Sequence, residues 1–217
     1  MLHVAIIDDR IDLRESMALI LREFIPDGWE CNDYSPIPDI DGYVRFINDN
    51  KVSVLILDEK LHEQAGGSFF HVDYNGHHVA AKIREYIPDF PIHIITGFKT
   101  DEDLQDSMAD IDSIYDRNEF AAEPEKIVRR FIRSANRFNE ANNERLAEYC
   151  RLSESAALGN LNGDGENRLS SLKQSLNLQY AGGAHPNISE TVSKLEDSLM
   201  KMEGLFSKLD LLLKGGG

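Results

Sequence analysis

Three short apolar runs, each followed by an acidic or hydroxyl side chain, constrain the fold of this chain more than any other feature. The runs are Leu2–Ile7, Val52–Leu57 and Pro91–Ile95. A strand covered by helices on both faces is hydrophobic along nearly its whole length, so each run predicts a buried parallel strand. The carboxyl ends of such strands meet at one edge of an open α/β sheet, where ligands bind. We call this the carboxyl edge and expect a functional site there.

The residues that follow the three runs are the first candidates for that site. Asp8 and Asp9 follow the first run, Asp58 follows the second, and Thr96 follows the third. Clustered carboxylates repel one another, and a hard cation such as Mg²⁺ relieves the repulsion because it prefers oxygen ligands. Asp58, on a middle strand, could attack a phosphoryl donor, with Thr96 donating a hydrogen bond to a phosphoryl oxygen. Arg117, at the end of a later strand, would balance the charge.

Strand and helix patterns alternate from the first run to about residue 122. Apolar residues at helical spacing predict three helices between the strands, and Thr100–Asp103 resembles a capping box that opens a short acidic helix. The predicted helices span residues 11–25, 40–50 and 76–86, and two further strands are expected at residues 29–34 and 111–115. This alternation predicts an α/β fold with a doubly wound five-stranded parallel sheet, in which the strand at 29–34 lies at an edge.

The composition changes after Pro124, where the patterns become entirely helical. Residues 125–157 contain no proline or glycine and predict one long helix. Its later part must extend beyond an α/β domain, because a helix rises about 1.5 Å per residue and a small domain spans about 30 Å. We therefore expect an α/β domain at residues 1–137 and an α-helical extension at residues 138–217.

The extension contains two further predicted helices. The first is short, at residues 166–180, and lies between two glycine-containing linkers. The second, at residues 188–214, has apolar residues at alternating spacings of four and three, which is the heptad pattern of a coiled-coil-like helix. Such a seam must be covered, either across a dimer or by another helix of the same chain. The sequence leaves both arrangements open, and we take a homodimer as the working expectation.

Charge and cysteine content limit the classes of partner and compartment. The net charge of −15 argues against nucleic acid as a partner, because nucleic-acid binding starts from clustered Lys and Arg. Cys31 and Cys150 lack the spacing of a metal site and suit reduced thiols in a cytoplasmic protein. No stretch reaches about 18 apolar residues, and no basic segment precedes the first strand, so we expect neither a membrane span nor a signal peptide.

Taken together, the motifs at the carboxyl edge resemble the response-regulator receiver domain of two-component signalling over about residues 1–135. The motifs are Asp8-Asp9 in IIDD, Asp58 in LILD and Thr96-Gly97 in IITG. Asn75-Gly76 stands where the family commonly has Asp-Gly before its third helix. The resemblance implies a flavodoxin-like receiver fold.

The resemblance also implies a role for each matched residue. Asp58 would be the phosphoacceptor, Thr96 the switch hydroxyl, and Gly97 the small neighbour that leaves room for the phosphoryl group. The implied Mg²⁺ ligands are the carboxylates of Asp8, Asp9 and Asp58 and the backbone carbonyl of Lys60. The expected cofactor is therefore Mg²⁺.

This chain departs from the family pattern at the end of the last strand. Arg117 stands at the place of the family's lysine, and it keeps the charge but is bulkier and can bind phosphate oxygens through two N–H groups. Asn118 replaces the proline that usually follows. The family's aromatic switch position is matched best by Ile114, with Tyr115 next to it. These departures bear on the strength of the conformational response more than on phosphorylation itself.

The connection from Glu59 to Asn75 is long for a loop in a compact domain, and loops of this length are typically functional. It is an insertion relative to the family, so Phe69 and Phe70 either pack on the rim of the sheet or are exposed for a partner. Four histidines lie in and after this loop, namely His62, His71, His77 and His78. They lack a ligand spacing matched by carboxylates, so we interpret them as solvated loop residues rather than a metal site.

Three functions remain in view. The leading hypothesis is a response regulator that accepts a phosphoryl group on Asp58 from a histidine kinase or phosphotransfer protein and signals through a downstream protein partner or dimerisation, not DNA. Such a chain is no enzyme beyond self-phosphotransfer and autodephosphorylation. The alternative is a phosphorylation-independent adaptor or scaffold whose C-terminal helices bind a partner. A phosphatase of the haloacid dehalogenase type is disfavoured, because that family needs a second Asp two residues after its nucleophile, and Arg10 stands two residues after Asp8.

Overall fold

The structure is a computed structural model and describes residues 2–62 and 72–176 of the chain. The chain divides into two compact units, Met1–Glu140 and Ala141–Gly217. The predicted heptad helix at residues 188–214 and the placement of Phe69 and Phe70 lie outside the described residues.

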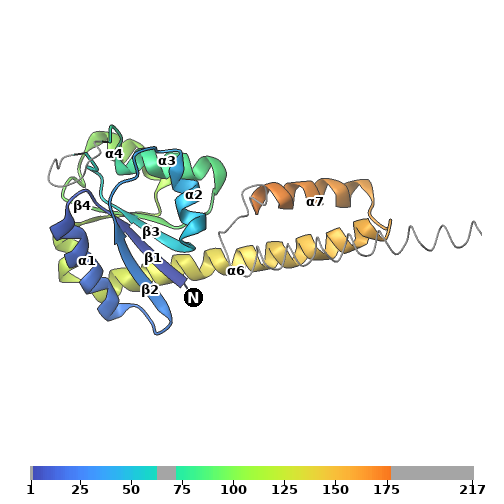
Figure 1. Ribbon diagram of the computed structural model, residues 1–217, viewed down its shortest axis with the longest axis horizontal. Helices are drawn as coiled ribbons and strands as arrows, with labels where there is room; N and C mark the ends of the chain where they lie inside the picture. The colour runs from blue at the N-terminus through green and yellow to red at the C-terminus, as the bar shows by residue number, and fades with distance from the viewer. Residues whose placement is uncertain (1, 63–71, 177–217) are drawn as a thin grey trace, which may run out of the picture. The chain divides into compact units, whose positions relative to one another are not determined.

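The first unit contains a five-stranded parallel sheet with the strand order β2-β1-β3-β4-β5 (Figure 1). Its strands are β1 (Leu2–Ile7), β2 (Trp29–Tyr34), β3 (Val52–Leu57), β4 (Ile92–Thr96) and β5 (Ser113–Asp116). Because successive side chains of a strand point to opposite faces, β1 sends Val4 and Ile6 to one face and Ala5 and Ile7 to the other. Both faces are buried, which confirms the expectation of apolar strands covered on two sides.

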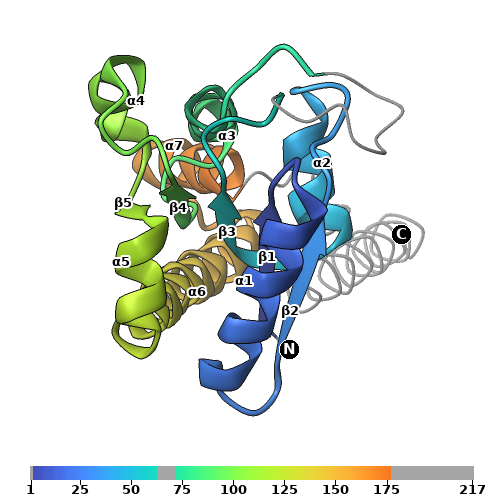
Figure 2. The ribbon, with the colours of Figure 1, turned by 90° about the vertical axis from the view of Figure 1, so that its left-hand side faces the viewer.

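Helices cover the two faces of the sheet, as Figure 2 shows. One face is packed by residues of three helices, α2 (Gly42–Asp49), α3 (Gly76–Tyr86) and α4 (Glu102–Asp106). The other is packed by residues of α1 (Ile11–Phe24), α5 (Arg117–Ala122) and the first part of α6 (Pro124–Ala157). A short 3₁₀ helix, η1 (Met108–Asp110), precedes β5. The doubly wound α/β fold predicted from the sequence is confirmed.

Several predicted boundaries were wrong, and local hydrogen bonds explain those of β5 and α4. β5 begins at Ser113 instead of residue 111, because the N–H of Ile111 is bonded to Met108 and closes η1. α4 is capped by Asp101 and not by Thr100, since the Asp101 side chain accepts a hydrogen bond from Asp103 N. α2 begins at Gly42, two residues after the predicted start.

The residues at the starts of the later helices explain where these helices begin. α6 begins at Pro124, where the missing N–H of proline leaves no helical hydrogen bond unmade, and continues without interruption for 34 residues. In the second unit, α7 (Gly163–Ser175) begins three residues before the predicted start, because the side chain of Asn162 accepts a hydrogen bond from Gly165 N at 2.9 Å. Within the described part of the chain, no helix combines the length and the apolar character needed to cross a bilayer.

Candidate functional site

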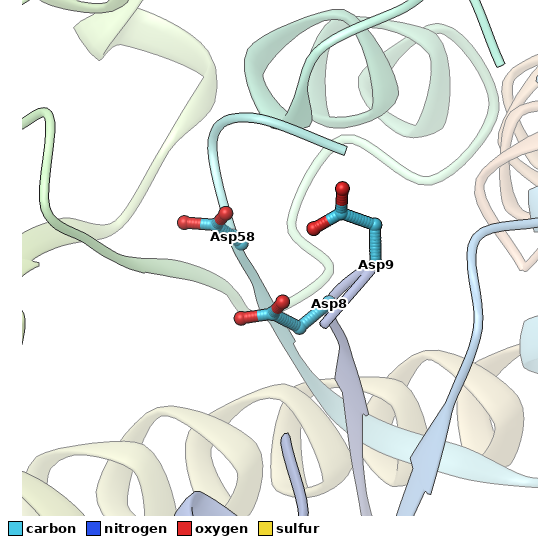
Figure 3. A group of neighbouring side chains, drawn as sticks. All are labelled: Asp8, Asp9 and Asp58. Carbon is cyan, nitrogen blue, oxygen red and sulfur yellow. The ribbon is translucent and has the colours of Figure 1, made fainter. Parts of the chain in front are cut away.

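The three acidic residues of the carboxyl edge lie together at the ends of two neighbouring strands. Asp8 directly follows β1, Asp58 directly follows β3, and Asp9 is next to Asp8. One carboxylate oxygen from each residue lies within 4.8 Å of the others, and Figure 3 shows the three side chains grouped at the ends of β1 and β3. Asp8 is fully buried and Asp58 is 3% exposed. The fold therefore brings together the three carboxylates that the sequence analysis singled out, while their roles stay predictions.

Arg117 supplies the positive charge that faces this cluster. Its Nη2 atom lies 2.9 Å from Asp58 Oδ1 and 3.1 Å from Asp8 Oδ2, so one nitrogen contacts both carboxylates. Arg117 is the first residue of α5, and its side chain is 24% exposed. The cation predicted at the end of the last strand is therefore in contact with two of the three carboxylates.

The backbone around Asp8 holds its carboxylate in place. Oδ1 of Asp8 accepts a hydrogen bond from Arg10 N at 2.8 Å, and Oδ2 accepts one from Arg117. The guanidinium of Arg14 donates to the backbone carbonyl of Asp8 at 3.2 Å and to the carboxylate of Asp33 at 3.1 Å. The turn after β1 is thus fixed from α1 as well as from α5.

Burial and mutual repulsion shift the pKa values of the buried carboxyl groups. Burial, followed by the negative charge of Asp58, raises the pKa of Asp8 to about 7. Burial also raises the pKa of Asp58, and the charge of Arg117 and a hydrogen bond from Thr96 oppose that rise. A cluster of this kind holds protons near neutral pH or takes up additional positive charge.

Thr96 and Gly97 lie where the sequence predicted, at the end of β4 beside Asp58. Thr96 is the last residue of β4 and is fully buried, and its Oγ1 accepts a hydrogen bond from Phe98 N at 3.2 Å. The hydroxyl also lies near the Asp58 carboxylate and lowers its pKa, against the effect of burial. A Cβ atom added at Gly97 would meet nothing within 4 Å, so packing does not require glycine and the space beside Thr96 is open.

Asn75 and Gly76 begin α3 directly against the backbone of Asp58. A Cβ atom at Gly76 would lie 2.2 Å from the carbonyl oxygen of Asp58, so only glycine fits there. Gly76 N also donates to the carbonyl of Glu59 at 2.8 Å. This close approach gives a physical reason for glycine at position 76, which the sequence analysis compared with the Asp-Gly motif of the family.

Similar proteins are found among solved structures. The sequence matches no family model and no curated protein. NtrX from Brucella abortus matches with a TM-score of 0.50 and 20% identity over 66% of this chain and 29% of that chain. A response regulator receiver domain protein from Methanospirillum hungatei matches with a TM-score of 0.49 and 16% identity, over 65% and 98% of the two chains.

The response regulator TrrA from Thermotoga maritima, solved in complex with Mg²⁺-BeF, matches with a TM-score of 0.44 and 20% identity, over 58% and 96% of the two chains. The strand order β2-β1-β3-β4-β5 with helices on both faces is the flavodoxin-like order in which ligands bind at the carboxyl edge. The α/β domain has the receiver fold. The fold that the motif resemblance implied is therefore confirmed.

Relative to the receiver pattern, the departures after β5 have local explanations. Asp116 caps α5 by accepting a hydrogen bond from Asn118 N at 2.7 Å, which a proline at 118 could not donate. Tyr115 is buried against Phe131, and its hydroxyl accepts a hydrogen bond from Arg130. Ile114 packs on the opposite side, in the core with α3 and α4. Tyr115 and Ile114 therefore face opposite sides of the sheet.

The three carboxylates of the carboxyl edge fit a magnesium ion. Mg²⁺ holds its oxygen ligands at about 2.0–2.1 Å in an octahedron, so two such oxygens lie at most about 4.2 Å apart. The oxygens of Asp8, Asp9 and Asp58 lie within 4.8 Å of one another, so small side-chain rotations would suffice. Hard carboxylate oxygens are also the donors that this ion prefers. Lys60 stands two residues after Asp58 and would offer its backbone carbonyl to the ion. Its side-chain ammonium forms an ion pair with Asp101 at 2.7 Å.

Sequence reasoning missed one polar contact beside the site. His77 was interpreted as a solvated histidine, but it is the second residue of α3 and is buried. Its Nδ1 lies 2.6 Å from Glu59 Oε1, and its backbone N–H donates to Glu59 Oε2 at 3.1 Å. The neighbouring His78 accepts a hydrogen bond from Asn75 N through Nδ1. These two histidines therefore belong to the start of α3. The one sequence feature that could have suggested a partner for His77 was the acidic Glu59, directly after Asp58.

Proposed function

We propose that this chain is a phospho-accepting response regulator, in which Asp58 takes a phosphoryl group from a histidine kinase or a histidine phosphotransfer protein. The observation that supports this most is the convergence of Asp8, Asp9 and Asp58 within 4.8 Å, with Arg117 in contact with Asp58. The hydroxyl of Thr96 lies near the same carboxylate, and the next residue, Gly97, has open space where a side chain would begin.

The proposed reaction is a direct transfer to the carboxylate. An oxygen of Asp58 attacks the phosphorus of a phosphohistidine, and a P–O bond forms as the P–N bond breaks. The electron pair of that bond returns to the imidazole nitrogen, which takes up a proton from solvent. Arg117 stabilises the negative charge on the transferring oxygens, and the Thr96 hydroxyl donates to one of them. The chain turns over no further substrate, apart from slow hydrolysis of its own acyl phosphate.

The residues that would hold Mg²⁺ are Asp8, Asp9 and Asp58, together with the backbone carbonyl of Lys60. The bound ion would supply positive charge to the phosphoryl oxygens and offset the repulsion among the three carboxylates. Without it, burial and then the negative charge of Asp58 raise the pKa of the fully buried Asp8 to about 7.

The output follows from the new charge at Asp58. A phosphoryl group adds a dianion to a buried position. Thr96, whose hydroxyl lies near Asp58 and accepts a hydrogen bond from Phe98 N, would turn toward it. The loop after β4 and α4 would follow. We propose that this change is passed to a downstream protein partner, or to a homodimer formed through residues 188–214, and not to DNA.

Mass spectrometry tests the proposal directly. The full chain is incubated with acetyl phosphate and Mg²⁺, and the intact mass and the modified peptide are determined. We expect one phosphoryl group on Asp58, removed by hydroxylamine, absent in EDTA and absent in Asp58→Asn. A wild-type chain that stays unmodified with Mg²⁺ would contradict the proposal.

One observation favours a second function, a phosphorylation-independent adaptor. Arg117 already contacts both Asp8 and Asp58, so their charges are partly neutralised without metal or phosphate. Such an adaptor would keep its oligomeric state and partner affinity in Asp58→Asn, whereas a phosphorylation-dependent regulator would lose the response to acetyl phosphate. Light scattering of both forms, with and without acetyl phosphate, separates the two functions.

A further inference from the structure

A buried acid–histidine pair lies directly beside the proposed metal site and takes no part in the chemistry described above. Glu59, the residue after Asp58, has no exposed surface, and the side chain of His77 is 7% exposed. The pair joins the turn after β3 to the first turn of α3, although the two residues are 18 positions apart. A buried carboxylate is destabilising unless its oxygens are bonded, so the geometry of this pair is informative.

Both oxygens of Glu59 are bonded by one residue. Oε1 lies 2.6 Å from Nδ1 of the His77 ring, and Oε2 accepts from the backbone N–H of His77 at 3.1 Å. The two contacts fix the carboxylate at two points, which leaves the Glu59 side chain no freedom to rotate. Glu59 therefore also caps the start of α3 from outside the helix.

The backbone of the same turn is held against α3 as well. The carbonyl of Glu59 accepts a hydrogen bond from Gly76 N at 2.8 Å, and the carbonyl of Asp58 lies so close to Gly76 that no Cβ fits. On the other side, Leu61 is 2% exposed and packs in the core. Lys60 lies between these two anchored residues, and its carbonyl is the proposed backbone ligand of Mg²⁺.

We propose that Glu59 and His77 are positioning residues for the metal site: their pairing fixes the turn that aims the Lys60 carbonyl at the ion. The inference rests on the proposed function, because it needs a metal at Asp8, Asp9 and Asp58. Neither residue touches the metal or the phosphoryl group. Partners of this kind, which orient a ligand from behind, typically change metal affinity by about 10- to 100-fold when they are lost.

The test measures Mg²⁺ binding alone, by calorimetry on the full chain, beside the thermal midpoint of each variant. Glu59→Ala is expected to bind Mg²⁺ at least about tenfold more weakly than the wild type. Glu59→Gln should restore most of the affinity, because its amide can accept from His77 N and donate to a neutral Nδ1. His77→Ala provides a second variant, and the double variant should lose no more affinity than Glu59→Ala, since the two act as one unit.

A matched control separates positioning from general stability. His93 is also a buried histidine with two side-chain partners, Ser113 Oγ at 2.7 Å and Ser134 Oγ at 2.9 Å, and it lies away from the carboxyl edge. His93→Ala should lower the thermal midpoint and leave Mg²⁺ affinity unchanged.

Three results have distinct meanings. Weaker Mg²⁺ binding in Glu59→Ala with normal binding in His93→Ala supports positioning. Equal Mg²⁺ affinity in Glu59→Ala and the wild type would overturn the inference and leave the proposed function standing. A wild type that binds no Mg²⁺ would overturn the proposed function itself, and the inference with it.

Discussion

At the scale of single residues, the chemistry of the site depends on how Arg117 contacts two carboxylates. Its Nη2 atom touches both Asp8 and Asp58, while its Nε is buried without a hydrogen-bond partner among the described residues. An arginine presents several N–H groups in a fixed plane, and a phosphoryl group on Asp58 would offer acceptors to more of them. At rest, Nη2 donates a hydrogen bond to Asp8 and forms an ion pair with Asp58, and a phosphoryl group on Asp58 could also accept from Nε–H.

Arg117 gives the first prediction. Arg117→Ala should slow labelling of Asp58 by acetyl phosphate by about 100-fold, because a single preorganised charge at a buried site contributes roughly that factor. Arg117→Lys should keep most of the rate, since a lysine retains the charge. Quench-flow labelling followed by intact mass measures both. If the alanine variant is labelled as fast as the wild type, Arg117 does not stabilise the transfer.

The raised pKa of Asp8 gives the second prediction. In the folded, metal-free chain this group, with its pKa near 7, binds a proton that the unfolded chain releases at much lower pH. Stability in EDTA should therefore fall as pH rises from about 4 to about 7, by a few kcal/mol at most. Urea unfolding across this range measures the slope, which should flatten in Asp8→Asn. Saturating Mg²⁺ should restore stability at neutral pH. A pH-independent wild type would contradict the prediction.

At the scale of elements, the start of α3 decides how the site is supported. The helix begins against the carbonyl of Asp58, and glycine at 76 makes that approach possible. The third prediction is that Gly76→Ala destabilises the chain by about 1–3 kcal/mol or more, because the added methyl group overlaps backbone that cannot move freely. Gly163→Ala is the control, since a Cβ at this first residue of α7 meets nothing within 4 Å. Equal urea midpoints for the two variants would argue against a close α3 contact.

Elements also show what the sequence could and could not predict. The buried strands were predictable, because strands covered on both faces are apolar throughout and end in the residues that line the site. The Glu59–His77 pair was not, since each residue alone is typical of a solvated loop and only the packing of α3 against β3 brings them together. Ile111 looked like a strand residue by its side chain, yet its backbone N–H closes η1. Pairings across the fold, unlike periodicity, leave no local signal.

At the scale of the whole molecule, the sequence predicts an output through the C-terminal part. The second unit contains α7 and the end of α6, where Arg168 and Glu148 form two hydrogen bonds, at 2.6 and 2.9 Å. The heptad pattern at residues 188–214 is a feature of the sequence, and its dimer remains a proposal. The acidic net charge of −15 favours protein partners over nucleic acid.

The fourth prediction concerns this output. The full chain should be a dimer by light scattering, and a chain ending at Ala157 should be a monomer with an unchanged ability to be labelled at Asp58. The apolar seam at residues 188–214 is unfavourable in water unless another helix covers it, so a chain without it lacks the surface that would drive dimerisation. A monomeric full-length chain would show instead that the seam packs within one chain.

One structure determination tests the central claim most directly, namely that three acidic residues of the carboxyl edge hold Mg²⁺ while Asp58 accepts a phosphoryl group. The full chain is crystallised with Mg²⁺ and beryllofluoride, which imitates an acyl phosphate. We predict beryllium bonded to an oxygen of Asp58, and Mg²⁺ ligated by the acidic cluster and the Lys60 carbonyl. Beryllofluoride absent from Asp58, with Arg117 still bridging Asp8 and Asp58 and no metal between them, would contradict the account.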